Sequence, residues 1–174
     1  MTDLDSVNLA LLGLRLILGA VMLAHGINHI IGGGKIAGTG RWFASLGMKP
    51  GTVHAWLASV TEIGGGILLV LGLLTPLGCA AVIGVMLVAL ITNHRKNGFF
   101  IFRPGEGYEY VLTLTVVAFC LAMLGAGEWS LDNALDLEDL AGTTGLWIAL
   151  VAGGGGAVAL LAAFWRPAPA ADDN

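Results

Sequence analysis

Residues 55–92 read AWLASVTEIGGGILLVLGLLTPLGCAAVIGVMLVALIT, and this stretch decides the fold. It contains two apolar runs, 55–74 and 77–92, and Glu62 is its only charged residue. A helix needs roughly 20 apolar residues to cross a bilayer. Thr75-Pro76 interrupts the pattern, because proline cannot continue a helix. The stretch therefore predicts two membrane-spanning helices joined as a tight hairpin.

Three further apolar segments, residues 8–31, 108–124 and 146–164, lie on either side of this hairpin. The whole chain of 174 residues is 56% hydrophobic and only 11% charged, whereas soluble domains carry about 25% charged residues. A soluble core of this size cannot hide so much apolar surface. We therefore predict an all-α polytopic membrane bundle, with a four-helix core and a fifth C-terminal spanning helix.

The basic residues outside the apolar segments predict an orientation. Lysine and arginine concentrate in cytoplasmic loops of membrane proteins. In a five-helix arrangement these residues all fall on one side of the membrane, and the other side carries no lysine or arginine. The residues on the basic side are Lys35, Arg41, Lys49, Arg95, Lys96, Arg103 and Arg166. We expect a multi-pass protein of a bacterial inner membrane, with the N-terminus outside and the C-terminus cytoplasmic. No basic run points to nucleic acid, so the expected surroundings are the bilayer and other membrane subunits.

Polar groups within or beside the apolar segments are the candidates for a site, because ionisable groups are costly in a bilayer and usually face the bundle interior. Most of them fall near the inner ends of the predicted helices, so we expect a polar pocket that opens toward the cytoplasm. Arg15 lies deeper than the others and needs an anion, for which Glu62 is the candidate. The pocket candidates are Arg15, His25, Lys35, Glu62, His94 and Glu109.

Several functions remain open for this pocket. It can bind a quinone head group, relay protons, hold a metal or haem, or simply fix helix packing. His25 and His29 share one helix face at spacing i, i+4, and His25 with His94 can ligate haem from two helices. A third metal ligand is not evident from spacing, so we assign no metal site and expect no cofactor, with quinone and haem as the alternatives. No nucleophile signature appears, and catalysis by the chain alone is not expected.

Two glycine clusters lie inside predicted helices, and glycine lets membrane helices approach closely. We predict helix packing at Gly64, Gly65 and Gly66, and at Gly153, Gly154, Gly155 and Gly156. The segment 32–54 mixes Trp42 and Phe43 with basic residues, so we expect it to lie in the inner headgroup layer.

A set of short motifs resembles the DoxX family between about residues 9 and 132. These are Leu14-Arg15-Leu16, His25-Gly26, Lys35, Phe43, Leu46-Gly47, Pro50, Glu62, Gly64-Gly65, Leu71-Gly72-Leu73-Leu74-Thr75, His94, Asn97-Gly98-Phe99, Glu109-Tyr110 and Gly127-Glu128-Trp129-Ser130-Leu131-Asp132. The resemblance implies a four-helix membrane protein. Relatives include small subunits of a thiosulfate:quinone oxidoreductase and proteins tied to membrane oxidoreductase complexes. It carries over no catalytic residue, and the fifth helix departs from the family pattern.

We therefore divide the chain into a DoxX-like membrane domain (1–132), an outer acidic loop with the fifth helix (133–165), and a disordered cytoplasmic tail (166–174). The favoured function is a non-catalytic accessory or anchoring subunit of a larger inner-membrane complex, docked through the acidic loop. A redox-linked subunit that interacts with quinone or binds haem is the first alternative. A component of a small-molecule or lipid transport assembly is the second.

Overall fold

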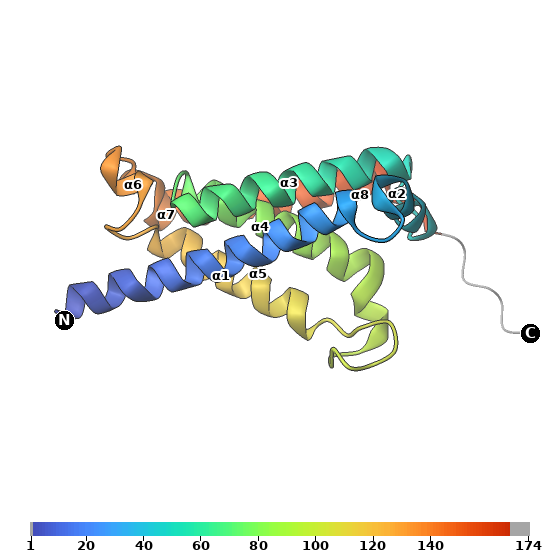
Figure 1. The fold of residues 1–174 in the computed structure, drawn as a ribbon, viewed down its shortest axis with the longest axis horizontal. Helices are drawn as coiled ribbons and strands as arrows, with labels where there is room; N and C mark the ends of the chain where they lie inside the picture. Colours follow the sequence, from blue (N-terminus) through green and yellow to red (C-terminus); the bar gives the residue numbers. More distant parts are fainter. Residues whose placement is uncertain (1, 168–174) are drawn as a thin grey trace, which may run out of the picture.

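The computed structural model describes residues 2–167, and it is a bundle of helices (Figure 1). The helices that form the bundle are α1 (Asp3–Ile31), α3 (Gly51–Leu71), α4 (Thr75–Ala89), α5 (Glu109–Leu124), α7 (Gly142–Ile148) and α8 (Gly156–Phe164). Two π-helical segments extend them: η1 (Leu90–His94) follows α4, and η4 (Ala149–Gly155) joins α7 to α8. The short elements are α2 (Lys35–Ser45), η2 (Arg95–Asn97), α6 (Leu131–Ala134) and η3 (Glu138–Leu140).

Four of these helices are long and apolar enough to cross a membrane: Asp3–Ile31, Gly51–Leu71, Thr75–Asn97 and Gly142–Phe164. α5 is also apolar, but it is only 16 residues long. The predicted all-α membrane bundle is confirmed, although several boundaries differ. The first helix starts earlier because Thr2 and Asp5 form a reciprocal cap at its N-terminus, which satisfies free N–H groups there.

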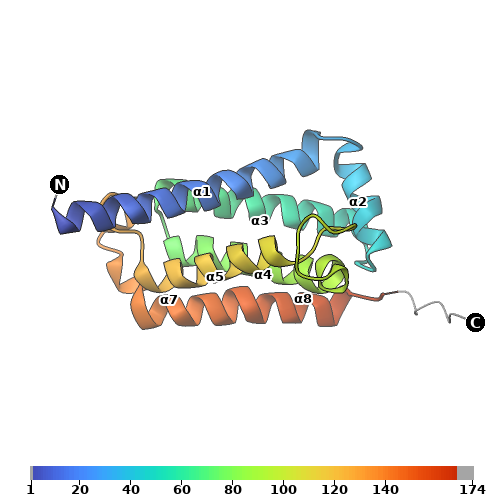
Figure 2. The same cartoon turned by 90° about the horizontal axis from the view of Figure 1, so that it is seen from below.

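The helices are arranged around α4 (Figure 2). The contacts run from α1 to α3, from α3 to α4, and from α4 to α5, and the fifth helix (α7, η4 and α8) packs on α4 and α5. One end of the bundle holds residues 32–50, 95–108 and 165–167, and we name it the basic end. The opposite end holds residues 72–74 and 125–141, and we name it the acidic end. The seven basic residues singled out above thus gather at one end.

The acidic end is closed by the carboxylate of Asp132, which is 4% exposed. Its two oxygens accept hydrogen bonds from the backbone N–H groups of Leu74 (2.6 Å) and Thr75 (2.9 Å). These groups lie at the start of α4, where N–H groups lack partners within the helix and a negative charge is favourable. The predicted hairpin is therefore held by a residue from a distant loop.

Arg15 belongs to this same closure and not to the predicted pocket. It is 1% exposed, and its Nη2 donates to the carbonyl of Trp129 at 2.6 Å. The expected pairing with Glu62 is wrong. Glu62 lies beside His29, which is fourteen residues beyond Arg15 on α1, or about 21 Å along the helix axis. Arg15 thus finds its one hydrogen-bond acceptor at the acidic end, in the carbonyl of Trp129, while its Nε has no hydrogen-bond partner among the described residues.

The loop that carries Asp132 is also fastened to the start of α1. The Asn8 side chain donates to Glu128 Oε2 and accepts from the Glu128 backbone N–H, both at 2.9 Å. Residues 127–132, the last motif of the family resemblance, are therefore tied to the chain through Glu128 and Asp132, whereas the side chains of Trp129 and Leu131 are exposed. The exposed carboxylates between α5 and α7 are Glu128, Asp136, Glu138 and Asp139.

Some of the clustered glycines pack helices and others do not. A β-carbon on Gly66 would lie 2.9 Å from the carbonyl oxygen of Gly19, and one on Gly65 would lie 2.7 Å from the β-carbon of Ala81. On the fifth helix, a β-carbon on Gly153 would lie 3.0 Å from the carbonyl oxygen of Ala80. These three glycines bring α1 to α3, α3 to α4, and the fifth helix to α4.

The other members of the clusters are not packing glycines, which corrects the prediction. A β-carbon on Gly64, Gly154 or Gly156 would meet nothing within 4 Å. One on Gly155 would meet only the carbonyl of Leu150, in its own helix.

The C-terminal end of α8 is fastened to the loop that follows α2. Trp165 Nε1 donates to the carbonyl of Leu46 at 2.9 Å, and the Arg166 backbone N–H donates to the carbonyl of Gly47 at 2.8 Å. The tail predicted from residue 166 thus begins with residues that are hydrogen-bonded to the bundle. Residues 168–174 lie outside the described part of the chain.

Candidate functional site

A cavity of about 660 Å³ runs from the histidines near the basic end to Leu68 and Leu77 near the acidic end. This volume lies within the range of small-molecule sites, about 300–1,000 Å³. All four histidines line the cavity, together with residues of α1, α2, α3, α4, η1, α5 and the fifth helix. Its polar lining is His25, His29, His54, Thr61, Glu62, Thr92, Asn93, His94, Glu106 and Tyr110, and the rest is apolar or glycine.

Glu62 is the carboxylate at the centre of this site. It lies about 16 Å along α3 from Gly51, at 1.5 Å per residue, and is 3% exposed. Its Oε2 is 3.1 Å from Nδ1 of His29 on α1. The two atoms are close enough for an ion pair, but their angles do not meet hydrogen-bond geometry, and both are buried without a hydrogen-bond partner. We therefore describe them as a contact pair with unused hydrogen-bonding capacity inside a cavity.

Glycine at position 26 makes this pair possible. A β-carbon on Gly26 would lie 3.0 Å from the Glu62 β-carbon and 3.0 Å from the carbonyl of Ser59. The absence of a side chain thus lets α1 and α3 approach where Glu62 and His29 face each other. In the His25-Gly26 motif, Gly26 allows α1 to pack on α3, and His25 lines the cavity.

His25 and Tyr110 form the wall between α1 and α5. The Tyr110 hydroxyl is 3.5 Å from His25 Nε2, a long contact, and the two rings are 6.2 Å apart. Tyr110 was not among the predicted pocket residues. Its neighbour Glu109 was chosen because a carboxylate near a membrane helix is costly, whereas a tyrosine at a helix start gives no comparable signal.

His94 reaches the cavity from η1. Its Nδ1 lies 2.9 Å from the carbonyl of Glu106 in the loop before α5, and its Nε2 lies 3.4 Å from the Asn93 amide nitrogen. Since a carbonyl only accepts, Nδ1 carries the proton in this arrangement. A π-helical turn inserts an extra residue and re-aims the side chains after it, and such turns are frequent at functional sites. Here it directs Thr92, Asn93 and His94 to the cavity.

His54, in the first turn of α3, is the functional candidate that the sequence did not reveal. It is 3% exposed, lines the cavity, and neither ring nitrogen has a hydrogen-bond partner among the described residues. Its ring packs edge-on against Phe164 at 5.0 Å. The sequence placed His54 at the end of an interfacial loop, whereas α3 already begins at Gly51. A buried polar ring without a partner is costly, so it points to a ligand group.

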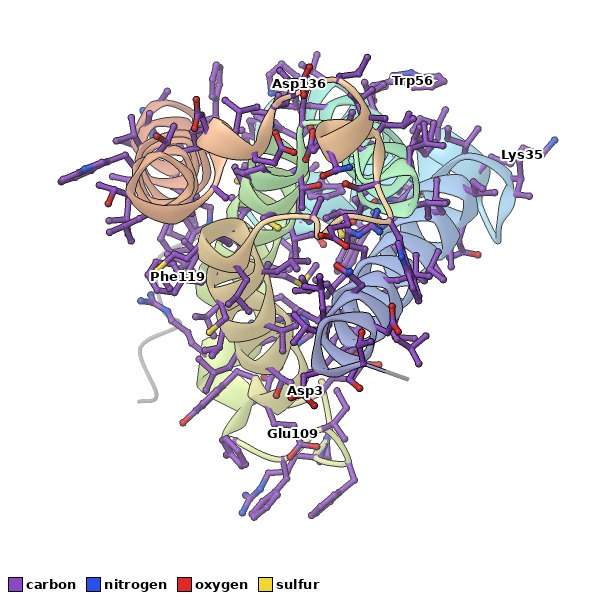
Figure 3. The ribbon with its side chains drawn as sticks, turned by 90° about the vertical axis from the view of Figure 1, so that its left-hand side faces the viewer. Asp3, Lys35, Trp56, Glu109, Phe119 and Asp136 are labelled. Atoms are coloured by element: carbon purple, nitrogen blue, oxygen red, sulfur yellow. The ribbon has the colours of Figure 1, made fainter. Side chains whose placement is uncertain are left out.

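Three predicted pocket residues lie elsewhere. Arg15 is at the acidic end, as described above. Lys35 starts α2, is exposed, and points away from the bundle (Figure 3). Glu109 opens α5 but does not line the cavity, and in Figure 3 it lies at the edge of the molecule, far from the centre of the bundle. Of the six predicted residues, the structure brings His25, Glu62 and His94 together around one cavity.

The donor set fits an organic ligand better than a metal ion. Within residues 2–167, no group of three or more histidine, cysteine, aspartate or glutamate side chains is arranged to hold a metal. The cavity instead combines an apolar lining with a few polar groups on different helices, which is how ligand sites fix the orientation of a small molecule. Imidazole and phenol groups can donate to carbonyl oxygens, and a carboxylate beside imidazole can exchange protons.

Comparison with known proteins agrees with the motifs. Residues 10–95 match the family model DoxX, a segment that runs from α1 to the end of η1 and includes all four histidines and Glu62. No curated protein and no solved structure matches the chain.

Proposed function

We propose that this chain, which belongs to the DoxX family, is a multi-pass membrane subunit whose internal cavity binds a quinone. The observation that carries the proposal is the Glu62–His29 pair, buried at the wall of a cavity of about 660 Å³ with unused hydrogen-bonding capacity. Groups of this kind inside a membrane protein mark ligand and proton pathways. Apart from its ten polar residues, the cavity is lined by apolar residues and glycine, as the ring and tail of a quinone require.

The proposed chemistry is proton-coupled reduction of the quinone to a quinol, or the reverse. Reduction takes two electrons and two protons, and an electron-donating partner subunit supplies the electrons. The chain supplies the environment: His25, Tyr110 and His54 orient the ring oxygens, and Glu62 with His29 delivers or accepts a proton. General acid–base groups placed in this way typically contribute about 10²–10⁴-fold to a rate.

Quinone binding to the purified protein in lipid nanodiscs tests this proposal. Trp42 lines the cavity, so a bound quinone should quench part of the tryptophan fluorescence. We expect saturable quenching by decylubiquinone in the wild-type protein. The Glu62→Gln variant keeps the size of the side chain but removes its proton-exchanging group, and it should bind at least about tenfold more weakly, the equivalent of one charge-assisted hydrogen bond.

Glu109→Gln is the matched control, because Glu109 is a carboxylate near the same end of the bundle that does not line the cavity. It should bind like the wild type. Non-saturable quenching in the wild type, or equal effects of the two substitutions, would contradict the proposal.

An anchoring subunit without a ligand is the second candidate, and the fifth helix favours it. Only 22% of its most apolar window is buried within the chain, compared with 33–50% for the other three long spans. A helix with so much free apolar surface has room for a neighbouring subunit beside lipid. Purification in mild detergent tests this role: a co-purifying membrane protein whose association is disrupted by Val151→Trp supports it, and a lone chain opposes it.

A further inference from the structure

The cavity extends beyond its polar groups into a groove between α3 and the fifth helix. The groove has α4 as its floor, because both neighbours pack on α4 through glycine contacts. Gly65 meets Ala81 on one side, and Gly153 meets Ile83 and the carbonyl of Ala80 on the other. α3 and the fifth helix are therefore held close to the same helix, on adjacent faces of it.

The walls of the groove lack side chains at facing positions. Gly64 on α3 and Gly156 at the start of α8 both line the cavity, and a β-carbon on either would meet nothing within 4 Å. Leu57, Thr61, Gly64 and Leu68 follow one another at helical spacing along the wall formed by α3. These residues form one face of the helix, so the groove runs along the helix axis and not across it.

The groove is closed at the basic end and is continuous with the polar site. Lys49 and Phe164 are joined there by a backbone hydrogen bond of 3.3 Å, and Trp165 donates to Leu46. His54 lies directly inside this closure, against Phe164, and Glu62 is on the inner side of α3 next to the stripe that includes Gly64. A molecule in the groove would thus have its polar head beside buried groups that lack partners.

We propose that this groove takes the apolar tail of the ligand, and that the ligand reaches the site sideways from the bilayer between α3 and α8. The occupant is a molecule with a polar ring and an isoprenoid or alkyl tail. This inference rests on the proposed function, since the head group would occupy the cavity around Glu62. It adds the tail as a recognised part of the ligand and the membrane interior as its source.

Two probes separate the head from the tail: 2,3-dimethoxy-5-methyl-1,4-benzoquinone, which has no tail, and decylubiquinone, which has ten tail carbons. We would fill the groove with Gly64→Leu and, separately, with Gly156→Leu, both at positions with open space around the β-carbon. Gly154→Leu is the matched control, because it is also open but does not line the cavity. Thermal unfolding in nanodiscs checks that each variant is folded.

We expect Gly64→Leu and Gly156→Leu to weaken decylubiquinone binding at least tenfold and to leave binding of the tailless quinone within about twofold of the wild type. Gly154→Leu should bind both probes normally. The tail assignment is overturned if both probes weaken equally, or if folded groove variants bind decylubiquinone as the wild type does. If the wild type binds neither probe, the proposed function itself fails, which is a different result.

Discussion

Two buried carboxylates, those of Glu62 and Asp132, have different roles in this chain. Asp132 accepts hydrogen bonds from backbone N–H groups with both carboxylate oxygens, and these bonds hold the acidic end together. Glu62 contacts His29 through Oε2, and that oxygen has no hydrogen-bond partner among the described residues. A fully satisfied carboxylate stabilises a fold, whereas a partly satisfied one next to a cavity is available for chemistry.

The role of Asp132 predicts a loss of stability without a loss of binding. Asp132→Ala leaves the N–H groups of Leu74 and Thr75 without acceptors, which costs about 1–3 kcal/mol. At roughly 2–4 °C per kcal/mol for a chain of this size, the apparent Tm should fall by about 2–12 °C in a detergent thermal-unfolding assay. Decylubiquinone affinity should stay unchanged. The exposed Asp136→Ala is the control, and an equal loss of stability there would refute the capping role.

The sequence located the polar residues but not their partners. Glu62, His25 and His94 were predicted because charged or titratable groups are rare in apolar segments, and all three line one cavity. Arg15 carried the same signal, yet its partner is a backbone carbonyl at Trp129. Every residue has a backbone carbonyl, so the sequence does not indicate which carbonyl will accept a hydrogen bond. The sequence did not identify His54 as a site residue, because its burial depends on where α3 begins.

At the scale of elements, glycine position decides both packing and open space. Gly65 and Gly66 lie on packed faces of α3, whereas the adjacent Gly64 faces the groove. Successive residues of a helix point in directions about 100° apart, so three glycines in a row cannot share one role. The sequence could locate the cluster, but only the neighbours of each residue assign its function.

Gly66 provides the corresponding stability prediction. Gly66→Leu would force a side chain against the carbonyl of Gly19 and the side chain of Leu23, and overpacking of this kind costs about 1–3 kcal/mol. We expect a lower unfolding temperature and weaker quinone binding, because α1 and α3 separate where Glu62 meets His29. Gly154→Leu should leave the unfolding temperature almost unchanged. Equal effects of the two substitutions would show that the α1–α3 approach does not hold the site.

At the scale of the whole molecule, the two ends of the bundle differ in charge, and this difference predicts its orientation. The seven basic residues outside α1 lie at the basic end, and the exposed carboxylates among the described residues lie at the other, except for Glu106. The positive-inside rule then predicts that the basic end, with the part of the cavity that holds His54 and His94, faces the cytoplasm. Protons would therefore exchange with the site from that side.

Single cysteines check this orientation in whole cells. Cys79 and Cys120 are first replaced by alanine, and Asp136→Cys or Lys96→Cys is then introduced; both positions are exposed. A membrane-impermeant maleimide should label position 136 in intact cells and position 96 only after the membrane is permeabilised. The reversed pattern would show that the acidic end faces the cytoplasm, and the direction of proton exchange would be reversed with it.

The fold class and the number of apolar helices followed from the sequence because hydrophobicity and length alone determine what can span a bilayer. The shape of the cavity could not be predicted from the sequence, because it depends on how α3 and the fifth helix both pack against α4. That arrangement involves residues more than sixty positions apart, and single-sequence patterns carry no information on such contacts.

The central claim is that a quinone binds in the cavity beside Glu62. Photolabelling with an azidoquinone in nanodiscs, followed by peptide mass spectrometry, tests it most directly. We predict that the label attaches to α1 and α3 peptides that contain His25, His29, His54 or Glu62, and that excess decylubiquinone or Glu62→Gln removes it. Label spread over exposed apolar residues such as Val158 or Val116, and not reduced by the competitor, would contradict the account.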